Sequence, residues 1–163
     1  MTAPAAATLD SLFMARAVAL SREHMEKGEG GPFGAVVTIG DRVVAEGWNQ
    51  VTSTNDPTAH AEVVAIRRAC AALGRFDLKG ATLYTSCEPC PMCLASALWA
   101  RLDRIVYANT RDDAAAIDFD DAPFYGEVAR APSTTMVTME HQPGAEALAV
   151  FRDWAAKSDK VAY

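Results

Sequence analysis

The sequence predicts an α/β protein in which a mixed sheet of five strands lies between helices on both faces, a three-layer α/β/α sandwich. Three observations support this fold class. Short runs rich in β-branched and aromatic residues alternate with longer segments of helical periodicity. Two early β runs are separated by only two residues, which predicts an antiparallel hairpin. A later succession of strand, helix and strand predicts a parallel crossover, so the sheet should be mixed.

Turn and cap residues divide the first half of the chain. The first helix has apolar residues at helical spacing and ends at a glycine-rich stretch. Two β runs follow, joined across Gly40 and Asp41. Asp56 and Pro57 then supply an N-cap and a proline at the first helical position, and Gly74 closes that helix. The predicted elements are a helix over residues 9–26, strands over 34–39 and 42–46, and a helix over 56–73.

The second half of the chain alternates strands and helices. Pro91 opens a helix between two apolar β runs, and a polar stretch covers residues 120–126. At 163 residues the chain has the length of one domain, so we expect a single domain over residues 1–163. The predicted elements are strands over 81–85, 104–108 and 136–139, and helices over 91–100, 113–117 and 145–157.

Composition narrows the class of partner. Half of the residues are hydrophobic (50%) and 22% are charged, a balance typical of globular proteins. The formal net charge is −6, which disfavours nucleic acid as a partner because proteins that bind phosphate backbones carry basic surfaces. No run reaches the ~20 apolar residues of a membrane span, and the first residues lack the pattern of a signal peptide. We therefore expect a cytoplasmic protein without a membrane partner.

His60, Cys90 and Cys93 have the residue types and spacing of a zinc site. Catalytic zinc takes three protein ligands and keeps an open position for water, and neutral histidine and thiolate cysteine are suitable donors. Both cysteines lie at a predicted helix start, where backbone N–H groups and the positive end of the helix dipole favour the thiolate. The sequence therefore predicts Zn²⁺ as a cofactor.

Glu62 follows His60 by two positions, and residues two apart on a helix point in different directions. Its side chain is therefore expected beside the metal rather than on it. A carboxylate placed there can take a proton from zinc-activated water and return protons to a ring nitrogen and to the leaving amine. The combination of His-x-Glu with a later Pro-Cys-x-x-Cys is the signature of zinc-dependent nucleobase deaminases.

Other interpretations of these residues stay open. Cys87 would be the natural fourth ligand of a closed structural zinc site, and the chain could be a non-catalytic zinc-binding or nucleotide-sensing module. Neither alternative explains the acid two positions after His60. We expect Cys87 near the ligands but not on the metal, and Cys70 as a packed thiol on an apolar helix face.

The chain resembles the bacterial guanine deaminases of the cytidine-deaminase-like superfamily over most of its length. The resemblance implies a cytidine-deaminase-like fold and hydrolysis of the purine base guanine to xanthine and ammonia. It further implies a homodimer in which C-terminal segments can be exchanged. The segments that carry the resemblance are residues 31–36, 55–63, 83–93 and 119–121 and the terminal Tyr163.

The resemblance also implies which residues meet the substrate. Glu127 is placed near the departing amine as a second catalytic acid, and the backbone N–H of Ala61 or Cys90 can hold the substrate or the reaction intermediate. Without the resemblance these residues have ordinary interpretations as core aromatics, a turn asparagine, capping or surface acids and a chain end. The positions that match the residues around the purine are Phe33, Asn49, Trp99, Asp121 and Tyr163.

Deaminases of guanosine, cytosine and transfer-RNA adenosine resemble this chain in the zinc motif, and they are the alternatives for its substrate. A nucleoside or an RNA loop needs a channel for its sugar, whereas a free base can be wholly enclosed. A C-terminal tail that carries Tyr163 over the site therefore favours guanine. Tyr163 would close either its own site or that of a partner.

Overall fold

The computed structural model describes residues 8–131 and 134–162. The chain divides into two compact units, Met1–Ala122 and Pro123–Tyr163. The sheet belongs to the first unit and has the strand order β2-β1-β3-β4, with β1 antiparallel to β2 and β3 and with β3 parallel to β4. The mixed sheet is thereby confirmed. The strands are β1 (Gly34–Ile39), β2 (Arg42–Trp48), β3 (Ala81–Cys87) and β4 (Arg104–Asn109).

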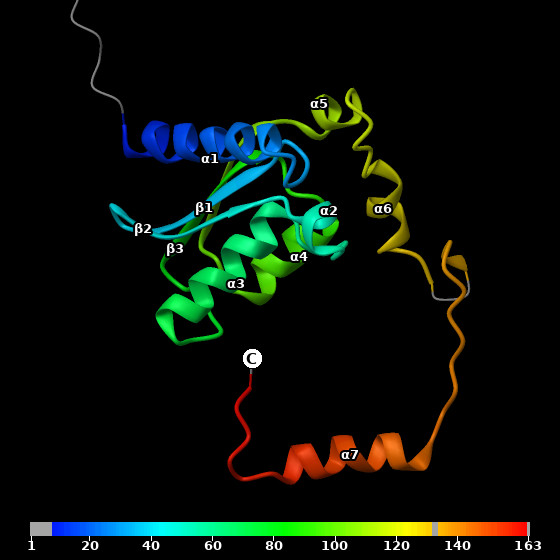
Figure 1. Ribbon diagram of the computed structural model, residues 1–163. Coiled ribbons are helices and arrows are strands. Elements are labelled where there is room, and N and C mark those ends of the chain that lie inside the picture. The colour runs from blue at the N-terminus through cyan, green and yellow to red at the C-terminus, as the bar shows by residue number, and fades with distance from the viewer. Residues whose placement is uncertain (1–7, 132–133, 163) are drawn as a thin grey trace, which may run out of the picture. The chain divides into compact units, whose positions relative to one another are not determined.

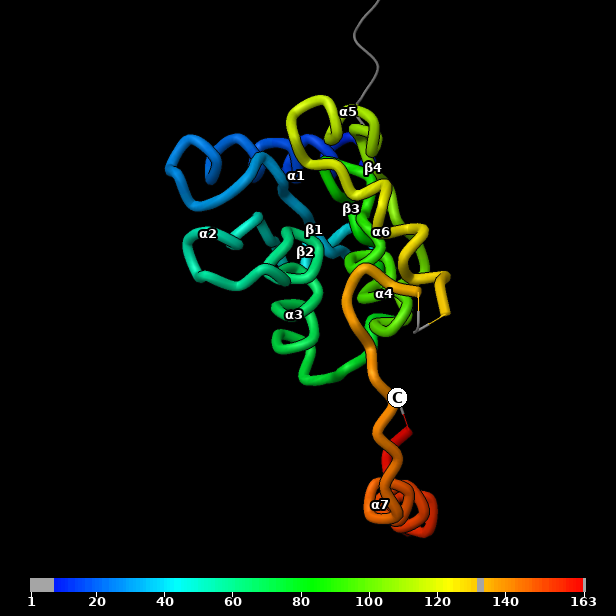
Figure 2. The backbone as a smooth tube through the Cα atoms, turned by 90° about the vertical axis from the view of Figure 1, so that its right-hand side faces the viewer, coloured from blue at the N-terminus to red at the C-terminus, as the bar shows by residue number. Residues whose placement is uncertain are grey.

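Helices cover both faces of this sheet, as predicted (Figure 1). α1 (Leu9–Glu26) packs on β1 and β3 from one face, and α3 (Ala61–Leu73) packs on β2 and β1 from the other. α4 (Pro91–Trp99) lies beside α3 in both views (Figure 1, Figure 2). The three-layer arrangement is therefore confirmed, and it places the starts of α3 and α4 next to each other.

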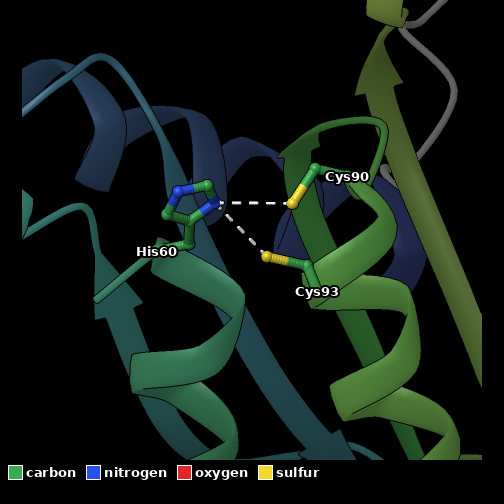
Figure 3. Close-up of side chains that lie close together, drawn as sticks. All are labelled: His60, Cys90 and Cys93. Carbon is green, nitrogen blue, oxygen red and sulfur yellow. Dashed lines mark hydrogen bonds between the residues drawn. The ribbon is translucent and has the colours of Figure 1, made fainter. Parts of the chain in front are cut away.

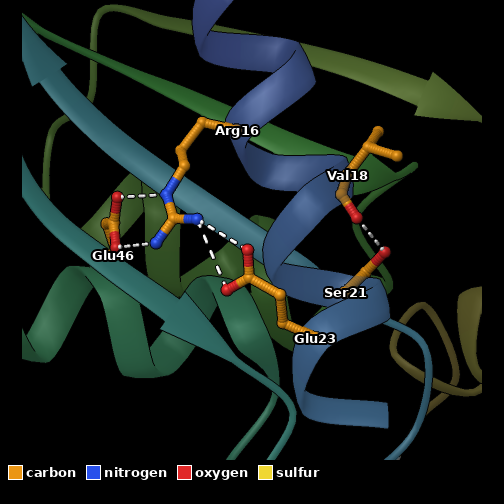
Figure 4. A network of polar contacts seen from close by, with 5 residues as sticks. All are labelled: Arg16, Val18, Ser21, Glu23 and Glu46. Atoms are coloured by element: carbon orange, nitrogen blue, oxygen red, sulfur yellow. Dashed lines mark hydrogen bonds and ion pairs between the residues drawn. The ribbon is translucent and has the colours of Figure 1, made fainter. Parts of the chain in front are cut away.

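α1 is anchored to the sheet by apolar and ionic contacts. The guanidinium of Arg16 donates to both carboxylate oxygens of Glu46 on β2 at 2.7 and 2.8 Å, and it also binds Glu23 on its own helix (Figure 4). The apolar contacts join Phe13, Ala17 and Leu20 to Val36 and Tyr84 of the sheet. These contacts hold α1 against one face of the sheet.

The first turns of α3 approach β2 very closely at Gly47. A Cβ at this position would lie 2.3 Å from the carbonyl oxygen of Ala61 and 2.6 Å from the backbone nitrogen of Ala65. Only a residue without a side chain fits such a contact. Gly47 therefore sets how near the beginning of α3 lies to the sheet.

The prediction of one helix over residues 56–73 is wrong at its beginning. A separate turn, α2 (Val51–Thr54), comes first, and α3 then begins at Ala61 with His60 at its N-cap. Asp56 caps a turn instead, because its Oδ1 accepts from the backbone N–H of Thr58 at 2.8 Å. An aspartate side chain accepts a hydrogen bond from the backbone N–H two residues ahead as readily as it caps a helix. An Asp-Pro pair therefore fits a turn as well as a helix start.

Three strands extend further than predicted, and α5 (Arg111–Ala115) begins two residues earlier than predicted. Thr110 and Asp113 form a capping box that starts this helix. β3 and β4 are parallel and end at the paired residues Cys87 and Asn109. Their chain exits therefore meet at one edge of the sheet, where ligand sites of α/β proteins form.

The second unit contains no strand among its described residues. The predicted strand over 136–139 does not form, and Met136, Val137 and Met139 are exposed. A strand needs a neighbouring strand to pair with, and among the described residues no strand pairs with this segment, so the described sheet has four strands rather than five. The polar stretch over 120–126 instead contains a helix. The last helices are α6 (Ala122–Glu127), which starts where the first unit ends, and α7 (Ala145–Ala156).

Among the described helices, none combines the length and the apolar character needed to cross a membrane.

The substitution Gly47→Ala should destabilise the fold, because its new methyl group overlaps the backbone of α3. We expect the free energy of unfolding to fall by about 1–3 kcal/mol in urea denaturation. Gly126→Ala is the matched control, since open space surrounds that glycine, and its effect should stay within about 0.5 kcal/mol. Equal stability of the two variants would contradict the close approach.

Candidate metal centre and active site

Two helix starts bring the predicted metal ligands together. His60 is the N-cap of α3, Cys90 is the N-cap of α4, and Pro91 follows at the first position of α4. Cys93 lies one turn further along α4. Figure 3 shows the imidazole of His60 facing both sulfurs across the gap between the two helices. The convergence predicted from sequence is therefore present in the fold.

The distances within this group fit a tetrahedral zinc ion. His60 Nδ1 lies 3.6 Å from Cys90 Sγ and 3.5 Å from Cys93 Sγ, and the three ligand atoms all lie within 4.8 Å of one another. Bonds of about 2.3 Å to sulfur and about 2.0 Å to nitrogen give N···S edges of about 3.5 Å in a tetrahedron. Both distances from His60 to the sulfurs thus match those expected around a zinc ion.

The electrostatics of the group also favour a cation. Hydrogen bonds from Cys93 and from His60 lower the pKa of the Cys90 thiol to about 4, although burial opposes this shift. The pKa of Cys93 is raised, because this thiol donates to Cys90 and is buried. The hydrogen bond between His60 and Cys90 in turn raises the pKa of the His60 imidazole. Positive charge is therefore stabilised beside the sulfur atoms.

Glu62 lies one residue inside α3 and is only 6% exposed. Burial raises the pKa of its carboxyl above the usual range, and the negative charge of Cys90 acts in the same direction. A raised pKa makes the carboxylate a stronger base, which favours the uptake of a proton from water. Glu62 therefore has the environment of an acid–base group next to the ligand cluster.

Asn49 is buried at the end of β2, and its carboxamide is oriented by the backbone. Its Oδ1 accepts from the N–H groups of Gly31 and Val51 at 3.2 Å each. The next residue, Gln50, donates its N–H to the carbonyl of Ala59, which precedes His60. Asn49 is thus held near the segment that carries His60. Because its Oδ1 is bound to the backbone, its amide NH₂ is the group that can donate to a ligand.

Phe33 and Asp121 come to the site from different segments. The ring of Phe33 packs edge-on against Phe119 with centroids 4.9 Å apart, and the carbonyl of Phe33 accepts from the N–H of Asn49. Burial raises the pKa of the Asp121 carboxyl, and the negative charge of Cys90 adds to the shift. Asp121 therefore lies within electrostatic range of the ligand cluster.

The substrate roles of three predicted site residues are not tested by the described contacts. Trp99 ends α4, six residues or about 9 Å beyond Cys93 along the helix axis, and is 65% exposed. Glu127 belongs to the second unit, where it binds Arg130 at 3.0 Å and accepts from the N–H of Met136 at 2.6 Å. Tyr163 lies outside the described residues. The substrate roles of all three stay predictions.

A pair that sequence reasoning missed joins the cysteine loop to the start of α5. Glu88 precedes Pro89 and Cys90, and its carboxylate accepts from the backbone N–H and the guanidinium of Arg111 at 3.0 Å. Cys87 Sγ lies 3.6 Å from the carbonyl oxygen of Thr110. An acidic residue beside the cysteine motif was visible in the sequence and could have marked Glu88. Its partner Arg111 could not be identified, because it lies 23 positions away.

A family model described as the zinc-binding region of cytidine and deoxycytidylate deaminases matches residues 7–109. The chain belongs to this family. It is 45% identical to the guanine deaminase of Bacillus subtilis, over 93% of this chain and 97% of that protein. The tRNA-specific adenosine deaminase of the same organism is 40% identical, over 61% of this chain and 62% of that protein.

Solved structures of this deaminase family have the same fold. The X-ray structure of the Bacillus subtilis guanine deaminase matches with a TM-score of 0.90 over 93% of this chain and 97% of that one. The guanine deaminase of Nitrosomonas europaea matches with a TM-score of 0.67 and 33% identity, over 74% and 69% of the two chains. The cytidine-deaminase-like fold and Zn²⁺ as the cofactor are therefore confirmed.

His60→Ala should lose bound zinc, because the two sulfurs that are left do not complete a catalytic site. We expect about one zinc per chain in the wild-type enzyme and far less in the variant after dialysis, measured by atomic absorption. Cys70→Ala is the control, and it should keep its zinc. Cys87→Ala should also keep its zinc, and a loss as severe as that of His60→Ala would instead indicate a closed four-ligand site.

Proposed function

We propose that this deaminase hydrolyses guanine to xanthine and ammonia. The observation that carries the proposal is the 45% identity to the Bacillus subtilis guanine deaminase, which extends over 93% of this chain, whereas the tRNA-specific deaminase of that organism matches 61% of it. Related chains with 33% and 30% identity were solved with 8-azaguanine and with 2,6-diaminopurine. A small purine base is thus the favoured substrate.

His60, Cys90 and Cys93 would hold the zinc ion in this reaction. When bound, zinc supplies Lewis-acid activation of the attacking water. Glu62 takes the proton that this water loses on attacking carbon 2 of guanine. It delivers that proton to the neighbouring ring nitrogen, then takes the proton left on the added hydroxyl oxygen and passes it to the amine, which leaves as ammonia as the carbonyl forms. The buried position of Glu62 and the raised pKa of its carboxyl suit the uptake of these protons.

The purine would lie between segments that converge on this cluster. The amide NH₂ of Asn49 donates to an acceptor on the ring edge, because its carbonyl is already bound to backbone N–H groups. Phe33 offers an aromatic face, and Asp121 accepts from purine N–H groups. Ala61 begins α3, so its N–H has no partner within the helix and would donate to the oxygen on the reacting carbon.

We also keep the expectation of a homodimer in which C-terminal segments are exchanged between single-domain chains. The second unit supports it, because none of its described residues is buried and α7 presents Val150, Phe151 and Trp154 to solvent. Exposed aromatic surface of this kind is typically covered by a partner. In such a dimer Tyr163 would close either its own site or that of the partner, as the resemblance implies. A cytoplasmic location stays a prediction.

The first test is ammonia release from guanine, guanosine, cytosine and adenine, with an adenosine-containing tRNA anticodon loop as a fifth substrate. We expect a strong preference for guanine. Glu62→Gln should lose ~10²–10⁴-fold or more of the turnover while its zinc content stays unchanged. Preference for the RNA loop would make the chain a tRNA deaminase instead, and near wild-type turnover of Glu62→Gln with full zinc would refute the proton-transfer role.

The second test is complementation between two inactive variants. A chain truncated after residue 122 keeps the ligand cluster without the second unit, and Glu62→Gln keeps the second unit without the acid. If the segments are exchanged, refolding the two variants together should restore part of the guanine deaminase activity that each lacks alone. Activity of the truncated chain by itself, or no recovery in the mixture, would contradict the exchanged dimer.

A further inference from the structure

The indole of Trp48 is clamped between side chains from two helices. The imidazole of His24, near the end of α1, stacks on it with centroids 3.6 Å apart and an interplanar angle of 5°. The guanidinium carbon of Arg68, on α3, lies 4.3 Å from the ring centroid. Both groups are too close to share one face of the indole, so Trp48 lies between them. Arg68 is itself held by a 3.0 Å hydrogen bond to the carbonyl of Glu46.

His24 also holds the loop that follows α1. Its Nδ1 lies 2.8 Å from Glu29 Oε2, and the backbone N–H of Glu29 donates to the carbonyl of His24 at 3.0 Å. The His24 side chain is only 12% exposed. This one residue therefore contacts both the end of β2, through Trp48, and the loop over residues 28–33, through Glu29.

These two segments carry Asn49 and Phe33. Asn49 follows Trp48 directly, and its carboxamide oxygen binds the N–H of Gly31 in the loop. The loop lies so close to it that a Cβ on Gly30 would come within 2.0 Å of the carbonyl oxygen of Asn49. A small shift of either segment would therefore turn the carboxamide of Asn49 away from its orientation.

We propose that His24 and Trp48 are positioning residues for the substrate, because their stack fixes the end of β2 against the 28–33 loop and so orients Asn49 and Phe33. The inference rests on the proposed function of these two residues in holding guanine. α1 itself is anchored elsewhere, by Phe13, Ala17 and Leu20 and by the Arg16–Glu46 pair (Figure 4). Loss of the stack therefore loosens the substrate segments without releasing the helix.

The test compares zinc-loaded wild-type enzyme with His24→Leu, His24→Phe and Arg22→Leu. His24→Leu loses both contacts, and we expect its KM for guanine to rise by about 10- to 100-fold, with a smaller change in kcat and an unchanged zinc content. His24→Phe keeps the stack and loses Glu29, so its KM should lie in between. Arg22→Leu is the control, since Arg22 is 74% exposed on the same helix, and its KM should equal that of wild type.

Amide hydrogen exchange gives a second measurement that does not depend on the substrate. In His24→Leu the amides of residues 28–34 and 48–51 should exchange faster, while those of β4 keep the wild-type rate. An unchanged KM in His24→Leu, uniformly faster exchange throughout the sheet, or an equal effect of Arg22→Leu would overturn the proposal. If the wild-type enzyme does not act on guanine, the proposed function fails, and the exchange pattern still decides whether the stack orders these two segments.

Discussion

The meeting of two helix N-termini is the constraint on which the rest of the structure depends. Neighbouring helices pack with their axes about 8–10 Å apart, yet His60 and the two cysteines must place their ligand atoms about 3.5 Å apart. This requires α3 and α4 to begin level with each other. Gly47 lets α3 lie close against β2, and Pro91 starts α4 directly behind Cys90. The sheet therefore serves to align two helix starts.

Sequence patterns predicted the parts of the fold that depend on local interactions. The bounds of α1 and β1 coincide with the predicted ones, because helical periodicity and a tight hairpin depend on neighbouring residues. Asp56 misled the prediction because two local hydrogen-bonding modes compete for the same side chain. The strand over 136–139 failed because β pairing needs a partner that no local pattern reveals. The sequence did not predict α6 (Ala122–Glu127), because the acidic residues that precede it made the segment resemble a polar loop.

The candidate site likewise contains residues that local spacing predicts and residues whose arrangement depends on distant partners. The ligand residues and Glu62 were recognisable because their spacing along two helices determines their geometry. The orientation of Asn49 depends on Gly31, 18 positions away, and the partner of Phe33 is Phe119. Such contacts exist only after folding. The family match ends at residue 109, so Phe119 and Asp121 lie outside the segment that the family model recognises.

The apolar clusters on the two faces of the sheet have a consequence for how the enzyme acquires its metal. The described residues that form them include neither His60 nor the two cysteines. Folding of the first unit is therefore driven by burial of apolar surface, unlike folding of small zinc fingers, which need the ion. The apolar core of the first unit therefore does not depend on the ligand residues for its packing. Since divalent ions differ in their affinity for such donors in the Irving–Williams order, the metal that the folded chain binds depends on the relative availability of these ions as well as on the ligand set.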